Sequence, residues 1–315
     1  MMVTSWPGGI YNATKEGNSC IQFGLPFVEK PTHESEDCLF LNVYKPVTND
    51  KKLLPVMVWI YGGGFQEGSI FFSMYDSAHL ASYGEVIVVS INYRLGPFGF
   101  LYGGDNNAPG NLGFHDQLLG LKWIQENIEN FGGDPKSVTI FGESAGSISV
   151  SALIQAPLAE GLFHRAIMQS GAVISTLFDN KDVALRKTMK FAVQLNCDIQ
   201  DNEQMVACLR TKSIEEIKKV VMNGSDGDEI LPIKAILYEN YHNRVDLIYG
   251  ATHDEGSLFI LLYFPELMND KNTFTMEKVH EMISSLMSQI NAEKSNEVID
   301  YYTKTLNASN INEVR

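Results

Sequence analysis

One serine lies between two glycines in the stretch SVTIFGESAGSISVSALI, from Ser137 to Ile154. The spacing Gly-Glu-Ser-Ala-Gly predicts a nucleophile elbow, in which a strand turns at once into a helix and holds the serine hydroxyl on a strained turn. The helix N-terminus that follows favours negative charge. Ser144 is therefore a candidate nucleophile for attack on a carbonyl carbon. A short G-x-S-x-G motif also arises by chance as a structural turn, but the strand before it and the helix after it favour the nucleophile.

Stabilising the oxyanion that such an attack creates requires backbone N–H groups near the serine. The stretch YGGGF, from Tyr61 to Phe65, offers them in a loop whose missing side chains let a substrate approach the backbone. Read alone, this stretch is more typical of a plain flexible turn. Ala145, the residue after the nucleophile, is the other expected donor.

In hydrolases with this elbow, an acid and then a histidine follow the serine along the chain. The stretch GATHDEGS offers Asp254 and Glu255 just after an apolar run, and a carboxylate there could orient a histidine. A pair of surface acids that cap a helix is the alternative. Only His280 follows Glu255, and it lies in an amphipathic helical pattern, so we expect the catalytic base to be missing from this sequence. The six earlier histidines fit surface or structural positions: His33, His79, His115, His164, His242 and His253.

The elements that must hold these residues can be read from hydrophobic patterning. Apolar runs predict buried strands at Leu53–Tyr61, Glu85–Tyr93, Ser137–Phe141, Arg165–Gln169 and Val245–Tyr249, and alternation predicts a half-exposed strand at Cys38–Tyr44. One predicted helix has Leu118, Leu121, Ile124 and Ile128 on its apolar face and Gln117, Gln125, Glu126 and Glu129 on the other. Further helices are predicted after Ser144, around residues 182–221 and within residues 275–305. Alternating buried strands and helices predict a mostly parallel sheet covered on both faces. The glycine stretch, Ser144 and the acidic segment then meet at the carboxyl edge of the sheet.

Composition excludes several classes of partner. The 315 residues are 44% hydrophobic and 20% charged, which is typical of a globular protein, and the formal net charge is −14. This charge argues against nucleic acid and anionic membrane surfaces as partners. Apolar runs are too short for a membrane span, and the first residues have neither the basic nor the apolar region of a signal peptide.

Cysteines and glycosylation sequons favour a secreted or lumenal protein. The four cysteines fall as two local groups, Cys20 with Cys38 and Cys197 with Cys208, although four cysteines allow three connectivities. Four buried thiols in a cytosolic protein are the alternative. Sequons for N-glycosylation occur at three asparagines, Asn12, Asn223 and Asn307.

Taken together, the motifs resemble the type-B carboxylesterase/cholinesterase family of α/β-hydrolases. The resemblance runs over nearly the whole chain, in the family's order. It is carried by SEDCLFLNVY, YGGGF, SINYRLGPFGF, APGNLGFHDQLLGLKWIQENIENFGGDP, VTIFGESAGSISV, FHRAIMQSG and THDEGS. It implies an α/β-hydrolase fold, with helices on both faces of a mostly parallel sheet, and a serine esterase that needs no metal or organic cofactor.

Several residues take roles from this resemblance. It implies that Ser144 is the nucleophile, that Glu255 is the triad acid, and that Gly63, Gly64 and Ala145 are the oxyanion-hole donors. Ser170, in MQSG, resembles a serine that forms a hydrogen bond close to the triad. The resemblance also pairs Cys20 with Cys38 and Cys197 with Cys208. Family members are mostly secreted or lumenal and often glycosylated.

The sequence also departs from the family pattern. The family's domain is much longer, and its histidine lies in a His-Gly loop about a hundred residues beyond the acid. We therefore expect residues 1–315 to be a single partial domain, truncated at both ends and incomplete at its C-terminus. Missing strands and helices would leave apolar surface exposed, so the isolated chain is expected to be poorly soluble or partly folded.

The resemblance leaves the substrate class open within esters. Cholinesterases carry a tryptophan in the first disulfide loop that holds a quaternary ammonium group. Here the segment IQFGLPFVEKPTHESED has no tryptophan, which favours a general carboxylesterase acting on small-molecule esters. The family also includes non-catalytic adhesion proteins, but these commonly lack the nucleophile, so the intact GESAGS favours an enzyme. The sequence indicates no oligomeric state.

Overall fold

The computed structural model describes residues 12–24, 29–48, 52–173, 179–223 and 243–252, together with four helical residues, Glu277, His280, Glu281 and Ser284. The expected helix at 275–305 therefore lies outside the described residues except at these four positions. The chain divides into two compact units, Met1–Gly250 and Ala251–Arg315. The paragraphs below concern the first unit. A single domain over residues 1–315 stays a prediction.

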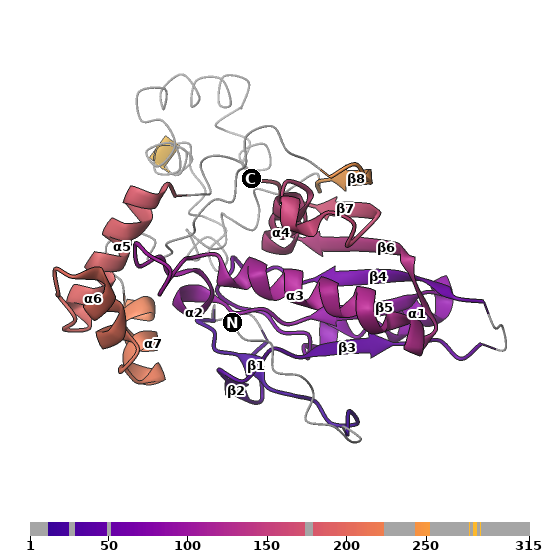
Figure 1. The fold of residues 1–315 in the computed structure, drawn as a ribbon, viewed down its shortest axis with the longest axis horizontal. Coiled ribbons are helices and arrows are strands. Elements are labelled where there is room, and N and C mark those ends of the chain that lie inside the picture. The colour runs from indigo at the N-terminus through magenta and orange to yellow at the C-terminus, as the bar shows by residue number, and fades with distance from the viewer. Residues whose placement is uncertain are drawn as a thin grey trace. The chain divides into compact units, whose positions relative to one another are not determined.

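A six-stranded sheet forms the centre of the first unit, in the order β3-β5-β4-β6-β7-β8 (Figure 1). Its strands are β3 (Leu41–Tyr44), β4 (Leu54–Ile60), β5 (Ile87–Ile91), β6 (Gly133–Glu143), β7 (Arg165–Gln169) and β8 (Asp246–Gly250). Only the β3–β5 pair is antiparallel, and the other four pairs are parallel. The mostly parallel sheet predicted from the sequence is thus confirmed. A short parallel pair, β1 (Ser19–Cys20) and β2 (Glu34–Ser35), lies outside it.

Burial along the strands follows their place in the sheet. All five residues of β5 are buried, as expected for a strand that lies between two neighbours and is covered on both faces. The prediction of a buried strand at Val245–Tyr249 is wrong about burial. Every residue of β8 is exposed, and Tyr249 keeps 76% of its surface. An apolar run encodes the strand, but burial depends on what covers it, and within the described residues β8 pairs only with β7.

Helices connect the parallel strands. They are α1 (Ala78–Gly84), α2 (Gly96–Phe100), α3 (Leu112–Asn127), α4 (Ala145–Ile154), α5 (Lys181–Gln194), α6 (Asn202–Leu209) and α7 (Ile214–Asn223), with 3₁₀ turns at Ser73–Tyr75, Ile128–Phe131 and Pro157–Ala159. The connection from β4 through α1 to β5 leads toward the β3 edge of the sheet. The connections from β5 through α3 to β6 and from β6 through α4 to β7 lead toward the β8 edge. Right-handed crossovers therefore place α1 on the face opposite to α3 and α4.

Gln117 corrects the expected polar face of α3. The helix runs from Leu112 to Asn127, and Gln117 is fully buried. Its Nε2 donates a hydrogen bond to the Oγ of Ser149 on α4, at 3.0 Å. A buried amide is tolerated where it finds a polar partner on a neighbouring element, and the spacing of residues along one helix does not reveal that partner.

One hydrophobic cluster surrounds the central sheet. A separate cluster joins α5, α6 and α7 to the segment around Phe23. It contains Phe23, Phe191, Leu195, Met205 and Leu209. The disulfide Cys197–Cys208 closes a loop inside this cluster, between positions 11 apart in sequence. Cys20 and Cys38 form the other disulfide, so the structure contains both pairs that the resemblance implies.

Replacing Cys197 and Cys208 together with serine is expected to lower the free energy of unfolding by about 3 kcal/mol, because the unfolded chain regains the entropy that the short closed loop removes. The loss is measured as a shift in the midpoint of urea unfolding under oxidising conditions. Adding a reductant should lower the midpoint of the wild type further than that of the variant. Equal midpoints for the two proteins before reduction would contradict the prediction.

Candidate active site

Ser144 lies at the turn between β6 and α4, where the sequence predicts the nucleophile elbow. Its backbone has φ 53° and ψ −121°, a left-handed conformation that is strained for any residue with a side chain. The N–H of Ser144 donates to the carbonyl of Gln169, at 2.9 Å, and its carbonyl accepts from Ile148, at 2.9 Å. These bonds on both sides hold the strained turn in place and leave the serine side chain partly exposed.

Three glycines explain how strand and helix come so close. A Cβ on Gly142 would lie 2.5 Å from the backbone of Gly146, and a Cβ on Gly146 would overlap the carbonyl oxygen of Ile60 on β4. A Cβ on Gly171 would overlap the carbonyl oxygen of Ser144 itself. The elbow is thus packed backbone against backbone, and only glycine fits at these positions.

The glycine stretch after β4 lies beside Ser144. A Cβ on Gly62 would stand 3.1 Å from the Cβ of Ser144. Gly63 and Gly64 have φ of 108° and 61°, and no described residue comes within 4 Å of the Cβ position of Gly64. The carbonyl of Gly63 accepts from the N–H groups of Gln66, at 3.0 Å, and Glu67, at 3.1 Å.

This arrangement determines where the next N–H points. In a trans peptide the C=O and the following N–H lie on opposite sides. Because the carbonyl of Gly63 turns toward residues 66–67, the N–H of Gly64 turns away from them. Ala145 is the first residue of α4, where helix N–H groups have no partner within the helix. The two expected donors, Gly64 and Ala145, therefore come from two different elements, the loop after β4 and the first turn of α4.

Strand register explains why these segments meet. Ile60 of β4 lies beside Gly142 of β6, which lies beside Met168 of β7. Met168 in turn lies beside Tyr249 of β8. The chain therefore leaves all four strands at the same carboxyl edge, the usual place of ligand sites in open parallel sheets.

Two side chains around the end of β4, those of Glu143 and Tyr75, were not predicted from the sequence. The carboxylate of Glu143 would lie 3.0 Å from a Cβ placed on Gly62, the same point that is close to Ser144. Tyr75 stacks on Tyr61, and burial, with smaller contributions from Glu143 and Glu67, raises the pKa of Tyr75 to about 12. The phenol therefore stays neutral at physiological pH. Glu143 stands inside the GESAG motif and could have been singled out, whereas no sequence signal marks Tyr75.

The serines of α4 also have a role that spacing did not reveal. The Oγ of Ser147 donates to the carbonyl of Gly171, at 2.5 Å, and the Oγ of Ser151 accepts from Val173, at 3.1 Å. These bonds tie the loop after β7 to the helix that begins at the nucleophile. Small buried hydroxyls of this kind stabilise a close contact between elements because they satisfy backbone groups that water cannot reach.

Some predicted site residues remain untested. The expected acid Glu255, and Asp254 and His253 beside it, lie outside the described residues. Ser170 follows β7 with φ 57°, and its N–H donates to the carbonyl of Gly250, at 2.8 Å. Its expected hydrogen bond close to the triad stays a prediction.

Three of the described histidines can be compared with the surface or structural positions expected from the sequence. His164 accepts a bond from the N–H of Val138 through Nδ1, at 3.3 Å, close to the amino end of β7 and so away from the carboxyl edge. Burial lowers the pKa of His115, on α3. His280 is helical and exposed. Among the described residues, no group of three or more His, Cys, Asp or Glu side chains is arranged to hold a metal ion.

Two of the glycosylation candidates fall in the described part of the chain. Asn12 is exposed, and its side-chain oxygen accepts from the N–H of Thr14, at 3.1 Å. Asn223 is the last residue of α7. Asn307 lies outside the described residues. Within the part of the chain that the structure describes, no helix is both long and apolar enough to cross a membrane.

Comparison with known proteins places this geometry in context. The sequence model of the Carboxylesterase family matches residues 2–315. The chain is 43% identical over 263 residues to Carboxylesterase 5A of Canis lupus familiaris, covering 79% of this chain and 45% of the relative. It is 34% identical to Acetylcholinesterase-1 of Trittame loki, covering 93% of this chain and 58% of the relative. It is 36% identical to Cholinesterase of Mus musculus, covering 96% and 55%. The chain thus spans about half the length of these relatives.

Proposed function

Because this chain belongs to the carboxylesterase family, we propose that its whole protein is a serine hydrolase of carboxylic esters. The mostly parallel sheet and its helices form the α/β-hydrolase fold that the family implies. The observation that carries the proposal is the strained Ser144, which stands at the N-terminus of α4 beside the loop of Gly63 and Gly64. A hydroxyl in this position meets a substrate carbonyl where backbone N–H groups can stabilise the resulting oxyanion.

In the proposed mechanism the Oγ of Ser144 bonds to the ester carbonyl carbon while a histidine takes its proton. The N–H groups of Gly63, Gly64 and Ala145 stabilise the tetrahedral oxyanion. The C–O bond to the alcohol then breaks, and the histidine returns the proton to that alcohol, which leaves an acyl-serine. Water attacks the acyl-serine by the same steps and releases the acid. Glu255 holds the histidine in the required tautomer.

The proposal extends to substrate class and compartment. A general carboxylesterase is favoured over a cholinesterase because the segment between Cys20 and Cys38 has no tryptophan to hold a quaternary ammonium. The two disulfides and the exposed Asn12 support a secreted or ER-lumenal glycoprotein. The substrate is a small-molecule ester.

Labelling by a fluorophosphonate probe tests the proposal. We expect one label for each full-length chain, located on Ser144 by peptide mass spectrometry, because only an activated serine reacts rapidly with such probes. Heat-denatured protein is the control and should take no label. Ser144→Ala is the second control and should take no label, since it lacks the reacting hydroxyl. An unlabelled native protein would overturn the esterase proposal and favour a non-catalytic binding role.

A further inference from the structure

The loop from Gly62 to Gly68 needs external support to place its N–H groups. It contains no strand or regular helix, and three of its glycines have positive φ: Gly63, Gly64 and Gly68. Such a segment has many accessible backbone conformations. An oxyanion donor, by contrast, acts only when it lies at hydrogen-bond distance from the developing charge. Contacts from elsewhere must select one conformation.

The side chain of Gln22 makes two such contacts. Its side chain is buried, with 4% exposed. The Nε2 donates to the carbonyl of Gly68, at 3.2 Å, and the Oε1 accepts from the N–H of the same Gly68, at 3.1 Å. The amide therefore engages both backbone groups of one residue, as a neighbouring strand would. A third bond runs from Nε2 to the carbonyl of Cys20, at 3.2 Å, so the amide is itself held in one orientation.

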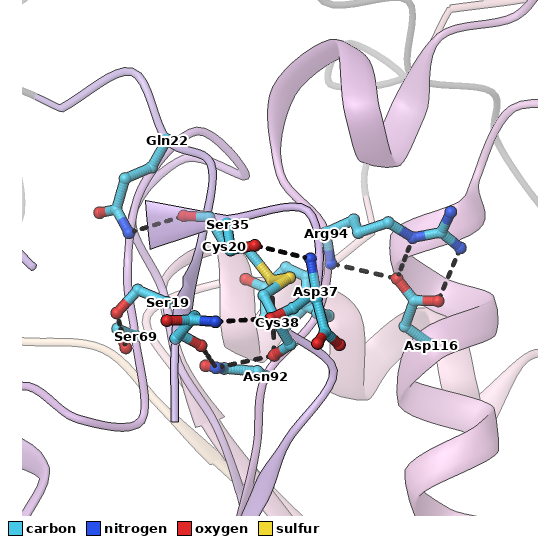
Figure 2. Close-up of a disulfide and its surroundings, with 12 residues drawn as sticks. Ser19, Cys20, Gln22, Ser35, Asp37, Cys38, Ser69, Asn92, Arg94 and Asp116 are labelled. Atoms are coloured by element: carbon cyan, nitrogen blue, oxygen red, sulfur yellow. Dashed lines mark hydrogen bonds and ion pairs between the residues drawn. A yellow bond between two sulfur atoms is a disulfide. The ribbon is translucent and has the colours of Figure 1, made fainter. Parts of the chain in front are cut away.

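Other residues of the disulfide segment, here residues 18–38 around the Cys20–Cys38 bond, reinforce this contact. The N–H of Phe23 donates to the carbonyl of Gln66, at 3.0 Å, and the Oγ atoms of Ser19 and Ser69 lie 2.7 Å apart. Figure 2 shows Ser19 and Gln22 on either side of Cys20, whose sulfur is bonded to that of Cys38.

The base of this segment is fastened in turn to the sheet. Asn92, just after β5, donates through Nδ2 to the carbonyls of Cys38, at 3.1 Å, and Asn18, at 3.2 Å (Figure 2). Its Oδ1 accepts from the N–H of Ile70, at 3.1 Å. Asn92 is buried with 1% exposed. One side chain therefore joins both ends of the disulfide segment to the chain that follows the glycine loop.

We propose that Gln22 is a positioning residue for the oxyanion hole. Hydrogen bonds from Gln22 and Phe23 hold the turn at residues 66–68. The N–H groups of Gln66 and Glu67 in that turn donate to the carbonyl of Gly63. The peptide bond between Gly63 and Gly64 is thereby fixed, and with it the direction of the Gly64 N–H. Gln22 does not touch the substrate. It restricts the loop to the conformation in which the carbonyl of Gly63 faces residues 66–67 and the N–H of Gly64 points the other way. The inference deepens the proposed function and rests on it for its catalytic half.

Amide hydrogen exchange tests the positioning directly and needs no activity. Gln22→Met keeps the volume of the side chain but removes the amide. We expect exchange in the peptide spanning residues 61–68 to become at least about 10-fold faster. Gln125→Met is the matched control: it also removes a part-buried amide, one that donates to the carbonyls of Pro135, at 3.0 Å, and Leu162, at 2.9 Å. It should leave exchange at 61–68 unchanged.

Kinetics of the full-length protein test whether the contact made by Gln22 affects catalysis, which is the catalytic half of the inference. Gln22→Met should lower kcat about 10-fold with KM unchanged, because a displaced donor weakens the transition state rather than substrate binding. A trifluoromethyl ketone forms a tetrahedral adduct with Ser144 that carries a negatively charged oxygen. Its affinity for Gln22→Met should be lower than for the wild type by the same factor. Gln125→Met should change neither quantity.

The outcomes separate the two proposals. Unchanged exchange at 61–68 in Gln22→Met overturns the inference, whatever the activity. Faster exchange with an unchanged kcat shows that Gln22 holds the loop without positioning the oxyanion hole, and overturns its catalytic half. A wild type that neither hydrolyses esters nor takes the fluorophosphonate label overturns the esterase proposal and this catalytic half with it, while the exchange result still decides whether Gln22 holds the loop.

Discussion

Replacing Ser144 with glycine is expected to abolish ester hydrolysis and to raise the melting temperature of the full-length protein. The activity falls about 10⁴-fold or more because the nucleophile is gone. The stability rises because Ser144 has φ 53° and ψ −121°, a conformation that costs a residue with a side chain about 1–3 kcal/mol but costs glycine little. After the extra chain entropy of glycine is subtracted, a net gain of about 1 kcal/mol remains, which corresponds to about 2 °C.

Ser144→Ala separates the two effects. It also lacks the hydroxyl, so it should be as inactive as the glycine variant. It keeps a Cβ in the same strained turn, so its melting temperature should stay close to that of the wild type. The measurement is thermal unfolding of the three proteins side by side, with hydrolysis of a neutral ester as the activity assay. A glycine variant that melts at or below the alanine variant would show that the turn stores no strain, and an active alanine variant would exclude Ser144 as the nucleophile.

Replacing Gly146 with alanine is expected to destabilise the fold by about 3 kcal/mol or more. A Cβ at this position would overlap the carbonyl oxygen of Ile60 and stand 2.8 Å from that of Tyr61. Both obstacles are backbone atoms at the end of β4, so no side-chain rotation can relieve the clash. The helix α4 must move away from the sheet, and Ser144 at its N-terminus must move with it. Activity is lost together with stability.

Gly250→Ala is the matched control for this prediction. Gly250 ends β8 and is exposed, and a Cβ placed on it would meet nothing within 4 Å in the described part of the chain. Its replacement should change the free energy of unfolding by less than about 0.5 kcal/mol. Urea unfolding of both variants, with the yield of folded protein as a second readout, measures the difference. A Gly146→Ala variant as stable as Gly250→Ala would mean that strand and helix are not packed backbone to backbone at the elbow.

Local patterning was sufficient for the elements that carry their own signal. The buried strands β4 and β5 were predicted within a few residues, since their apolar runs are continuous and end at turn residues. The glycines around Ser144 predicted the elbow because a strained turn and close packing both require that residue type. In each case the physical cause lies within a few residues of its effect.

Predictions that depended on distant neighbours fared worse. The strand β8 was predicted to be buried, but it is exposed, because burial is a property of what packs against a strand. Gln117 was assigned to a polar face, but it is buried against Ser149 on another helix. No sequence pattern marked Tyr75, because its stacking on Tyr61 arises from tertiary packing.

The sequence by itself determined the fold class, the elbow at Ser144 and the glycine loop, because glycine, serine and apolar runs restrict the backbone locally. Only the tertiary structure decided what holds that loop in place. Gln22 and Gly68 are 46 positions apart, and their contact exists because β4, β5 and the disulfide segment converge at one edge. An amide in a sequence looks the same whether it faces water or a backbone, and only the folded chain provides the partner that gives Gln22 its proposed role.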